Sequence, residues 1–275
     1  MAIITISHEM GAGGSEIGMA LAQRLGYRYV DQELISEASR RYGLAEEKLS
    51  HLDEAKPSLF ERFDAETRRY ITVLQTVLYE FAADDNVVLM GRGGQWLLRG
   101  VPHVLRIRVM APFNLRVKRV AKKMAGQMGE TVNPRSVSEM VRRDDAEKAG
   151  RMRYLYEEDL ADPALYDLVL NAEKLSAGAS VEFVTGLLSR PELAATPASR
   201  QLVADLALGS QVQVALATHP ETRRYRITVE AKQGVVTLEG TSALDQAAEV
   251  VRGCPGVVDV KLQQPEVPPI PPFVA

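Results

Sequence analysis

The chain has 275 residues, 46% of them hydrophobic and 25% charged, with a formal net charge of −3 at pH 7. This composition is typical of a globular protein with one large domain or two smaller ones. The small negative charge gives no overall field that attracts nucleic acid or an anionic membrane, so we expect no nucleic-acid partner. No apolar run approaches the roughly 20 residues of a membrane helix, so we expect no transmembrane segment.

Cysteine and histidine are both rare. One cysteine, Cys254, excludes an intramolecular disulfide, and together with four scattered histidines it predicts no metal cluster. The N-terminal residues lack a basic segment followed by an apolar stretch of about 7–15 residues, the pattern of a signal peptide. We therefore expect a cytoplasmic protein.

The first segment carries the strongest functional signal. An apolar strand over residues 2–7 runs into a glycine-rich turn, and an amphipathic helix follows over 14–25. Such a turn lets backbone N–H groups converge on a phosphate at the positive end of the helix. An ordinary tight strand–helix turn is the alternative. The candidate phosphate-binding residues are Gly11, Ala12, Gly13, Gly14 and Ser15.

One charge is missing from this turn. The usual P-loop pattern has a lysine after its last glycine, but Gly14 occupies that place here. Ser15 follows, at the position where P-loop kinases have the hydroxyl that binds Mg²⁺. We therefore assign Ser15 as the candidate metal contact and expect other cations to reach the phosphates.

The next elements alternate between strand and helix. Strands are predicted at residues 27–30, 87–90, 104–110 and 168–171, and helices at 32–42, 61–83, 115–128, 137–152 and 181–188. Asp31 precedes the first of these helices and is a candidate N-cap, whereas residues 44–60 are polar and predicted to be flexible. The alternation predicts an α/β, P-loop NTPase-type three-layer fold with a mainly parallel sheet. Ligands bind such sheets at the carboxyl ends of the strands.

A second unit follows a change in composition near residue 190. The predicted ranges are a first domain at 1–190, a linker at 191–204, a second domain at 205–264 and a proline-rich flexible tail at 265–275. The second domain is read as a small α+β module with the order helix 202–217, strand 225–230, strand 234–238, helix 243–252 and strand 257–262. Its predicted core residues are Tyr225, Ile227, Val229, Val236 and Leu238.

The first domain resembles the cytidylate kinase-like family, a branch of the P-loop nucleoside monophosphate kinases. The likeness rests on Ile-Thr-Ile-Ser at 4–7, Gly-Ala-Gly-Gly at 11–14, Tyr-Val-Asp-Gln-Glu-Leu-Ile at 29–35, Val-Leu-Met-Gly-Arg-Gly-Gly at 88–94, and the stretch 145–171. Members of this branch usually lack the P-loop lysine too. They often carry arginine at the position of Ser15 and another basic residue at the position of His8.

The resemblance implies phosphoryl transfer from ATP, with Mg²⁺, to CMP or dCMP. It places Arg92 on the acceptor phosphate, where a surface salt bridge is the alternative. Asp31 either contacts the acceptor nucleoside or only caps its helix. Further cations come from the charged helix, where Arg142, Asp145, Lys148 and Arg151 are spaced by three and are expected on one face. Lys148 and Arg151 are the candidate catalytic cations and Arg142 a candidate ATP-binding residue, unless this helix is only a solvated charged one.

Four other arginines receive weaker interpretations. Arg116 and Arg119 are expected on a solvated helix face, with a nucleotide contact as the alternative, and Arg106 and Arg108 are expected to pair with nearby carboxylates.

The second domain resembles a BON module through residues 234–240 and 253–260. The likeness implies an interaction module with a protein or lipid partner that the sequence does not identify. Two other functions remain open for the whole chain. It is either a nucleotide-binding protein without catalysis, or a kinase acting on another small acceptor.

Overall fold

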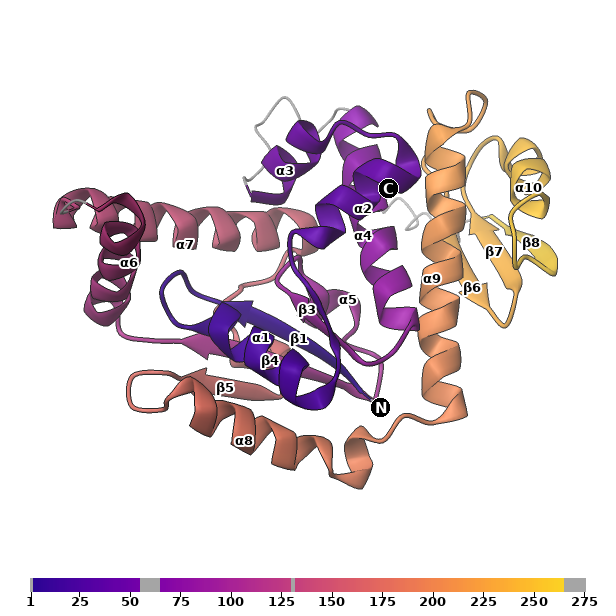
Figure 1. Ribbon diagram of the computed structural model, residues 1–275. Coiled ribbons are helices and arrows are strands. Elements are labelled where there is room, and N and C mark those ends of the chain that lie inside the picture. Colours follow the sequence, from indigo (N-terminus) through magenta and orange to yellow (C-terminus); the bar gives the residue numbers. More distant parts are fainter. Residues whose placement is uncertain (1, 55–64, 130–131, 265–275) are drawn as a thin grey trace, which may run out of the picture. The chain divides into compact units, whose positions relative to one another are not determined.

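The computed structural model describes residues 2–54, 65–129 and 132–264 (Figure 1). The chain divides into two compact units, Met1–Val203 and Ala204–Ala275. Among the described helices, none is both long and apolar enough to span a membrane.

The first unit is built on a parallel sheet. Its strands are β1 (Ile3–His8), β2 (Arg28–Val30), β3 (Val87–Met90), β4 (Val104–Met110) and β5 (Leu168–Asn171). They lie in the order β2-β3-β1-β4-β5, and each neighbouring pair is parallel. The glycine turn after β1 and the glycine–arginine turn after β3 therefore lie side by side at the carboxyl edge of the sheet.

Helices cover both faces of this sheet, which gives three layers (Figure 1). They are α1 (Gly14–Leu25), α2 (Glu33–Tyr42), α3 (Glu46–Glu54), α4 (Ala65–Ala83), α5 (Gly94–Leu97), α6 (Phe113–Met128), α7 (Pro134–Tyr156) and α8 (Ala177–Leu188), with short 3-10 turns η2 (Pro163–Leu165) and η3 (Pro191–Leu193). Helices α1 and α8 pack together on one face, while α4 and α5 contact the other. The predicted P-loop-type α/β fold is confirmed.

Alternation along β1 explains the layers. Ile4 and Ile6 are fully buried against Ile17 and Leu21 of α1, on the α1 face of the sheet. Thr5 points the other way and lies under α5. Since β1 is the central strand, both of its faces are covered, and Ile3 through Ser7 are all buried.

Several predicted boundaries were wrong. Residues 46–54 form helix α3 instead of a flexible segment, and residues 55–64, including the start of the predicted helix 61–83, lie outside the described residues. Helix α7 begins at Pro134 because the side chain of Asn133 accepts from the Arg135 N–H and proline is suited to the first turn. It also extends to Tyr156, four residues beyond the predicted end.

The second unit is a mixed three-stranded sheet with two helices. Its elements are α9 (Pro197–Thr218), β6 (Thr228–Lys232), β7 (Val235–Glu239), α10 (Leu244–Arg252) and β8 (Asp259–Gln263), with β6–β7 antiparallel and β7–β8 parallel. The predicted α+β order is confirmed, although α9 starts within the predicted linker, at residue 197. Val236 and Leu238 are fully buried, as predicted, but Tyr225 is 48% exposed and does not belong to the core. The predicted tail, 265–275, lies outside the described residues.

Candidate active site

Two cavities open at the carboxyl edge of the parallel sheet. The inner cavity, of about 380 Å³, is lined by Ser7, His8, Met10, Asp31, Gln32, Met90, Gly91, Arg92, Gly93, Gln95, Asp144, Lys148, Arg151, Met152, Leu155, Tyr156 and Leu160. The loop cavity, of about 980 Å³, is lined by the glycine turn, by α6 and by residues just after β5. His8, Met10 and Lys148 line both cavities, so the two meet at these side chains.

The glycine turn lines the loop cavity with all five of its predicted residues, 11–15. Gly11 and Gly13 have φ angles of +78° and +92°, a left-handed conformation that favours glycine. Within the part of the chain that the structure describes, no side chain makes a capping hydrogen bond at the N-terminus of α1. Because a helix leaves its first N–H groups without acceptors in the helix, this end of α1 is suited to an anion.

Gly14 explains why the loop has no lysine. A Cβ atom built on Gly14 would lie 2.3 Å from the Cβ of His8, which is closer than any side chain permits. The side chain of His8 thus occupies the space beside the position where the P-loop pattern has its lysine. Burial lowers the pKa of His8, and the charge of Lys148 lowers it further, so the imidazole is neutral at pH 7. The loop itself therefore supplies no full positive charge at this point.

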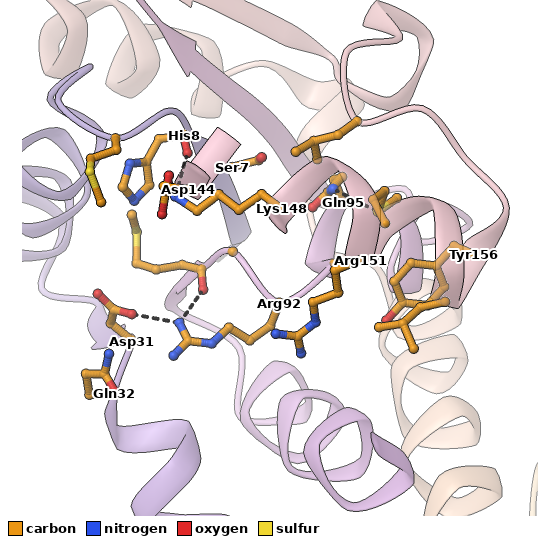
Figure 2. Close-up of a pocket in the computed structure, with 17 residues that line it drawn as sticks. Ser7, His8, Asp31, Gln32, Arg92, Gln95, Asp144, Lys148, Arg151 and Tyr156 are labelled. Carbon is orange, nitrogen blue, oxygen red and sulfur yellow. Dashed lines mark hydrogen bonds and ion pairs between the residues drawn. The ribbon is translucent and has the colours of Figure 1, made fainter. Parts of the chain in front are cut away.

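Arg92 reaches the inner cavity from a strained turn. Its φ angle is +55°, between Gly91 at +65° and Gly93 at +73°, and such a conformation costs an arginine about 1 kcal/mol. The guanidinium donates to Asp31 Oδ1 at 2.8 Å and to the Met90 carbonyl at 3.4 Å. The side chain is 13% exposed. The two predicted acceptor-site residues, Arg92 and Asp31, are therefore held together (Figure 2).

Asp31 does not cap helix α2. The N-cap position belongs to Gln32, whose side chain makes no capping bond. The Asp31 carboxylate instead accepts from Arg92 and, through Oδ2, from the Tyr29 hydroxyl at 3.3 Å. Burial and the Asp31 charge raise the pKa of Tyr29 to about 12, so its hydroxyl stays a donor. The capping interpretation was wrong, whereas a contact with the acceptor stays a prediction.

Helix α7 presents Asp144, Lys148 and Arg151 to the inner cavity, at spacings of four and three. Lys148 Nζ lies 2.9 Å from Asp144 Oδ2 and donates to the His8 carbonyl at 3.3 Å. Lys148 and Arg151 are thus brought together with Arg92. Arg142 is exposed and stacks 5.0 Å from the centre of the Phe113 ring, and neither cavity includes it.

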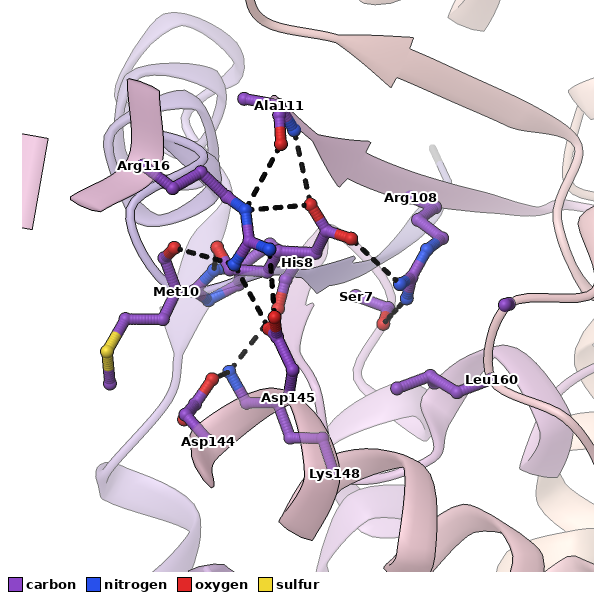
Figure 3. A network of polar contacts seen from close by, with 12 residues as sticks. Ser7, His8, Met10, Arg108, Ala111, Arg116, Asp144, Asp145, Lys148 and Leu160 are labelled. Atoms are coloured by element: carbon purple, nitrogen blue, oxygen red, sulfur yellow. Dashed lines mark hydrogen bonds and ion pairs between the residues drawn. The ribbon is translucent and has the colours of Figure 1, made fainter. Parts of the chain in front are cut away.

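Arg116 is buried, not solvated as the sequence predicted. Its side chain is 6% exposed and makes paired hydrogen bonds to Asp145 at 3.1 and 2.8 Å. It also lies 3.2 Å from Glu9 Oε2 and donates to the Ala111 and Met10 carbonyls (Figure 3). Asp145 therefore faces α6 and not the cavity, so the predicted face with a spacing of three was wrong. Because an α-helix has 3.6 residues per turn, side chains spaced by three move progressively around the helix axis and do not stay on one face.

Two further arginines bind neighbouring segments of the first unit. Arg119 lines the loop cavity and donates to the carbonyls of Ala12 and Ala172, at 3.4 and 2.8 Å. Arg106 forms the predicted carboxylate pair, with Asp167 at 2.7 Å. Sequence reasoning missed Asp144, Gln95 and Tyr156 in the inner cavity. The Asp144–Lys148 spacing of four was the available signal for the first of these.

Comparison with known proteins identifies the family. Residues 3–174 match the model of the cytidylate kinase-like family, and residues 204–263 match the BON domain. The chain belongs to the cytidylate kinase-like family.

The cytidylate kinase of Methanocorpusculum labreanum is 30% identical over 186 residues, which cover 68% of this chain and 96% of that protein. The cytidylate kinase of Staphylothermus marinus is 30% identical over 177 residues, covering 64% and 90%. An uncharacterized protein from Eubacterium ventriosum matches the structure with a TM-score of 0.53 and 16% identity, over 69% of this chain and all of that one. This last likeness shows the fold alone.

The Gly14–His8 contact predicts that Gly14→Ala destabilises the first unit by about 1–3 kcal/mol, because one added methyl group must displace the end of β1 or the start of α1. Thermal unfolding followed by circular dichroism measures the change. Gly186→Ala in α8 is the matched control, since nothing lies within 4 Å of its added Cβ and alanine favours a helix. Equal melting temperatures for the two variants would contradict the close approach.

The Arg116 network predicts that Arg116→Met lowers the free energy of unfolding by about 3 kcal/mol, because Glu9 and Asp145 lose the cation between them. Urea denaturation measures the loss. Arg40→Met is the control, because the Arg40 side chain is 70% exposed and we expect no change there. A midpoint for Arg116→Met equal to that of Arg40→Met would refute the role assigned to the network.

Proposed function

We propose that this protein transfers a phosphoryl group from ATP to a nucleoside monophosphate, with CMP or dCMP as the preferred acceptor. The observation that carries the proposal is the meeting of the two cavities at His8, Met10 and Lys148. A phosphate-binding loop lies on one side of this junction and a cavity with paired Arg92 and Asp31 on the other. Phosphoryl transfer requires such an arrangement, because donor and acceptor must meet in line.

On the donor side, the N–H groups of the loop and the uncapped end of α1 bind the triphosphate in this proposal. The fit rests on the open helix end and on the cations of the loop cavity, which include Arg119, Lys122 and Lys123. The Ser15 hydroxyl, which lines the same cavity, would hold Mg²⁺, and the bound ion would neutralise phosphate charge.

On the acceptor side, Arg92 exchanges its bond with Asp31 for two parallel bonds to the monophosphate. Asp31 then accepts from a hydroxyl of the acceptor sugar. Lys148 and Arg151 stabilise the negative charge that develops on the transferred group. Lys148 is suited to this role because its ammonium is fixed at the junction by Asp144 and by the His8 carbonyl.

We propose that the BON domain serves localisation or partner binding. The support is the match of residues 204–263 to the BON domain, because the resemblance implies an interaction module.

The test is a coupled assay of ADP release over a panel of nucleoside monophosphates. Turnover highest with CMP or dCMP supports the proposal. The neutral His8 and the absent loop lysine favour one competitor, a protein that binds nucleotide without catalysis. ATP binding in calorimetry without turnover on any acceptor would establish that competitor, and turnover on another small acceptor alone would change the assigned substrate.

Arg92→Ala is expected to reduce kcat/KM for the acceptor at least about tenfold, because the monophosphate loses at least one charged hydrogen bond. ATP affinity stays unchanged, because Arg92 lines the inner cavity and not the loop cavity. Steady-state kinetics and ATP calorimetry measure the two effects. Arg40→Ala, on the exposed side of α2, is the control. A loss of ATP affinity equal to the loss of acceptor efficiency would place Arg92 on the donor instead.

A further inference from the structure

Gln95 is a buried polar side chain that the proposed chemistry does not use. It lies in α5, directly after the glycine–arginine turn, and is 2% exposed. It nevertheless lines the inner cavity. Figure 2 shows Gln95 and Tyr156 at one side of this cavity, with Asp31 and Gln32 at the other.

The carboxamide of Gln95 has a weak partner within the protein. Its Nε2 lies 3.7 Å from the Met152 sulfur, and thioethers are poor acceptors. Among the described residues, no donor bonds to the Gln95 carbonyl oxygen. A buried amide that bonds so weakly is unfavourable unless a ligand completes its hydrogen bonds.

The Met152 contact fixes the orientation of the Gln95 amide. Thioether sulfur accepts hydrogen bonds and cannot donate them, so the NH₂ group must be the end that faces Met152. The opposite end, Oε1, is then left to accept a hydrogen bond. Met152 is held in place in turn, since it is buried and packs with Leu165 and Tyr166.

We propose that Gln95 is a specificity-determining residue that accepts a hydrogen bond from the exocyclic amino group of the acceptor base. Met152 is its positioning residue. The inference rests on the proposed kinase function and assigns the preference for an aminopyrimidine to one oxygen atom. Cytosine offers an N4 amine, whereas uracil has a carbonyl oxygen at that position. With uracil, two hydrogen-bond acceptors, this oxygen and Gln95 Oε1, would face each other. A site built to bond a donor rejects an isostere that lacks it.

The side chains beside Gln95 fit a flat base. Leu155 and Tyr156 of α7 line the cavity next to Met152, and the Tyr156 hydroxyl accepts from Gln75 Nε2 at 3.2 Å. An aromatic or apolar wall holds any pyrimidine equally well. Discrimination between cytosine and uracil must therefore come from a polar group at the base edge, which is the place we assign to Gln95.

The test compares kcat/KM for CMP and UMP, which share their sugar and phosphate. The wild-type protein is expected to prefer CMP by at least about tenfold. Gln95→Leu lowers CMP efficiency at least about tenfold and changes UMP efficiency less than about threefold. Met152→Leu keeps the core volume but frees the amide to turn, so it narrows the CMP/UMP ratio mainly by raising UMP efficiency.

Gln23→Leu, an exposed glutamine of α1, is the matched control and keeps the wild-type ratio. Equal use of CMP and UMP by the wild-type protein, or an unaltered ratio in Gln95→Leu, would overturn the inference. An unaltered ratio in Met152→Leu would overturn the role of the thioether. Gln95→Leu and Met152→Leu change different positions and different side-chain volumes. Met152→Leu therefore still tests the inference if Gln95→Leu does not fold.

The inference and the proposed kinase function fail in different ways. If no monophosphate is phosphorylated, the proposed function fails, and calorimetric affinities for CMP and UMP become the test of Gln95. Tighter binding of CMP that disappears in Gln95→Leu would support the role of Gln95 even then. Equal affinities for the two nucleotides would overturn it.

Discussion

The buried guanidinium of Arg116 holds helix α7 against the end of the central strand. It bonds Asp145 of α7 on one side and Glu9, just after β1, on the other, while its own backbone belongs to α6. Three segments far apart in sequence therefore meet at one cation. Because Asp145 faces Arg116, its neighbour Asp144 and, four residues on, Lys148 are turned toward the inner cavity. The position of the Lys148 ammonium in the cavity depends on this network around Arg116.

The same arrangement places positive charge beside a loop that has no lysine. The packing of His8 on Gly14 excludes a long side chain at that position, and the neutral imidazole supplies no charge. Positive charge instead comes from Lys148 of α7, whose ammonium lies at the His8 carbonyl, and from Arg92 of the next loop. Because this cation lies on α7 and not in the loop, the geometry of the site depends on the contacts that hold α7 in place.

The sequence predicted the sheet better than the site. The strands Val87–Met90, Val104–Met110 and Leu168–Asn171 had the predicted boundaries. Each is a short segment rich in β-branched or apolar residues, which in Val104–Met110 alternate with arginines. The roles of Asp31 and Arg116 were missed because their partners lie 61 and 29 residues away, at Arg92 and Asp145. Local patterns such as caps and helix faces cannot reveal contacts of that range. Gln95 gave no signal at all, since only burial makes its amide unusual.

Two of the candidate catalytic cations, Arg92 and Lys148, share a further property. Arg92 is paired with Asp31 and Lys148 with Asp144, so each cation is already oriented by a carboxylate that lines the same cavity. A bound phosphate must compete with these carboxylates, which weakens ground-state binding. In the proposed reaction Arg92 gives up its bond with Asp31 for the acceptor phosphate, whereas Lys148 stays oriented by Asp144. Charge that develops in the proposed transition state would then meet a Lys148 ammonium that needs little reorganisation. By this argument Asp144 does for Lys148 what Asp31 does for Arg92, and both carboxylates belong to the site although neither needs to touch the transferred group.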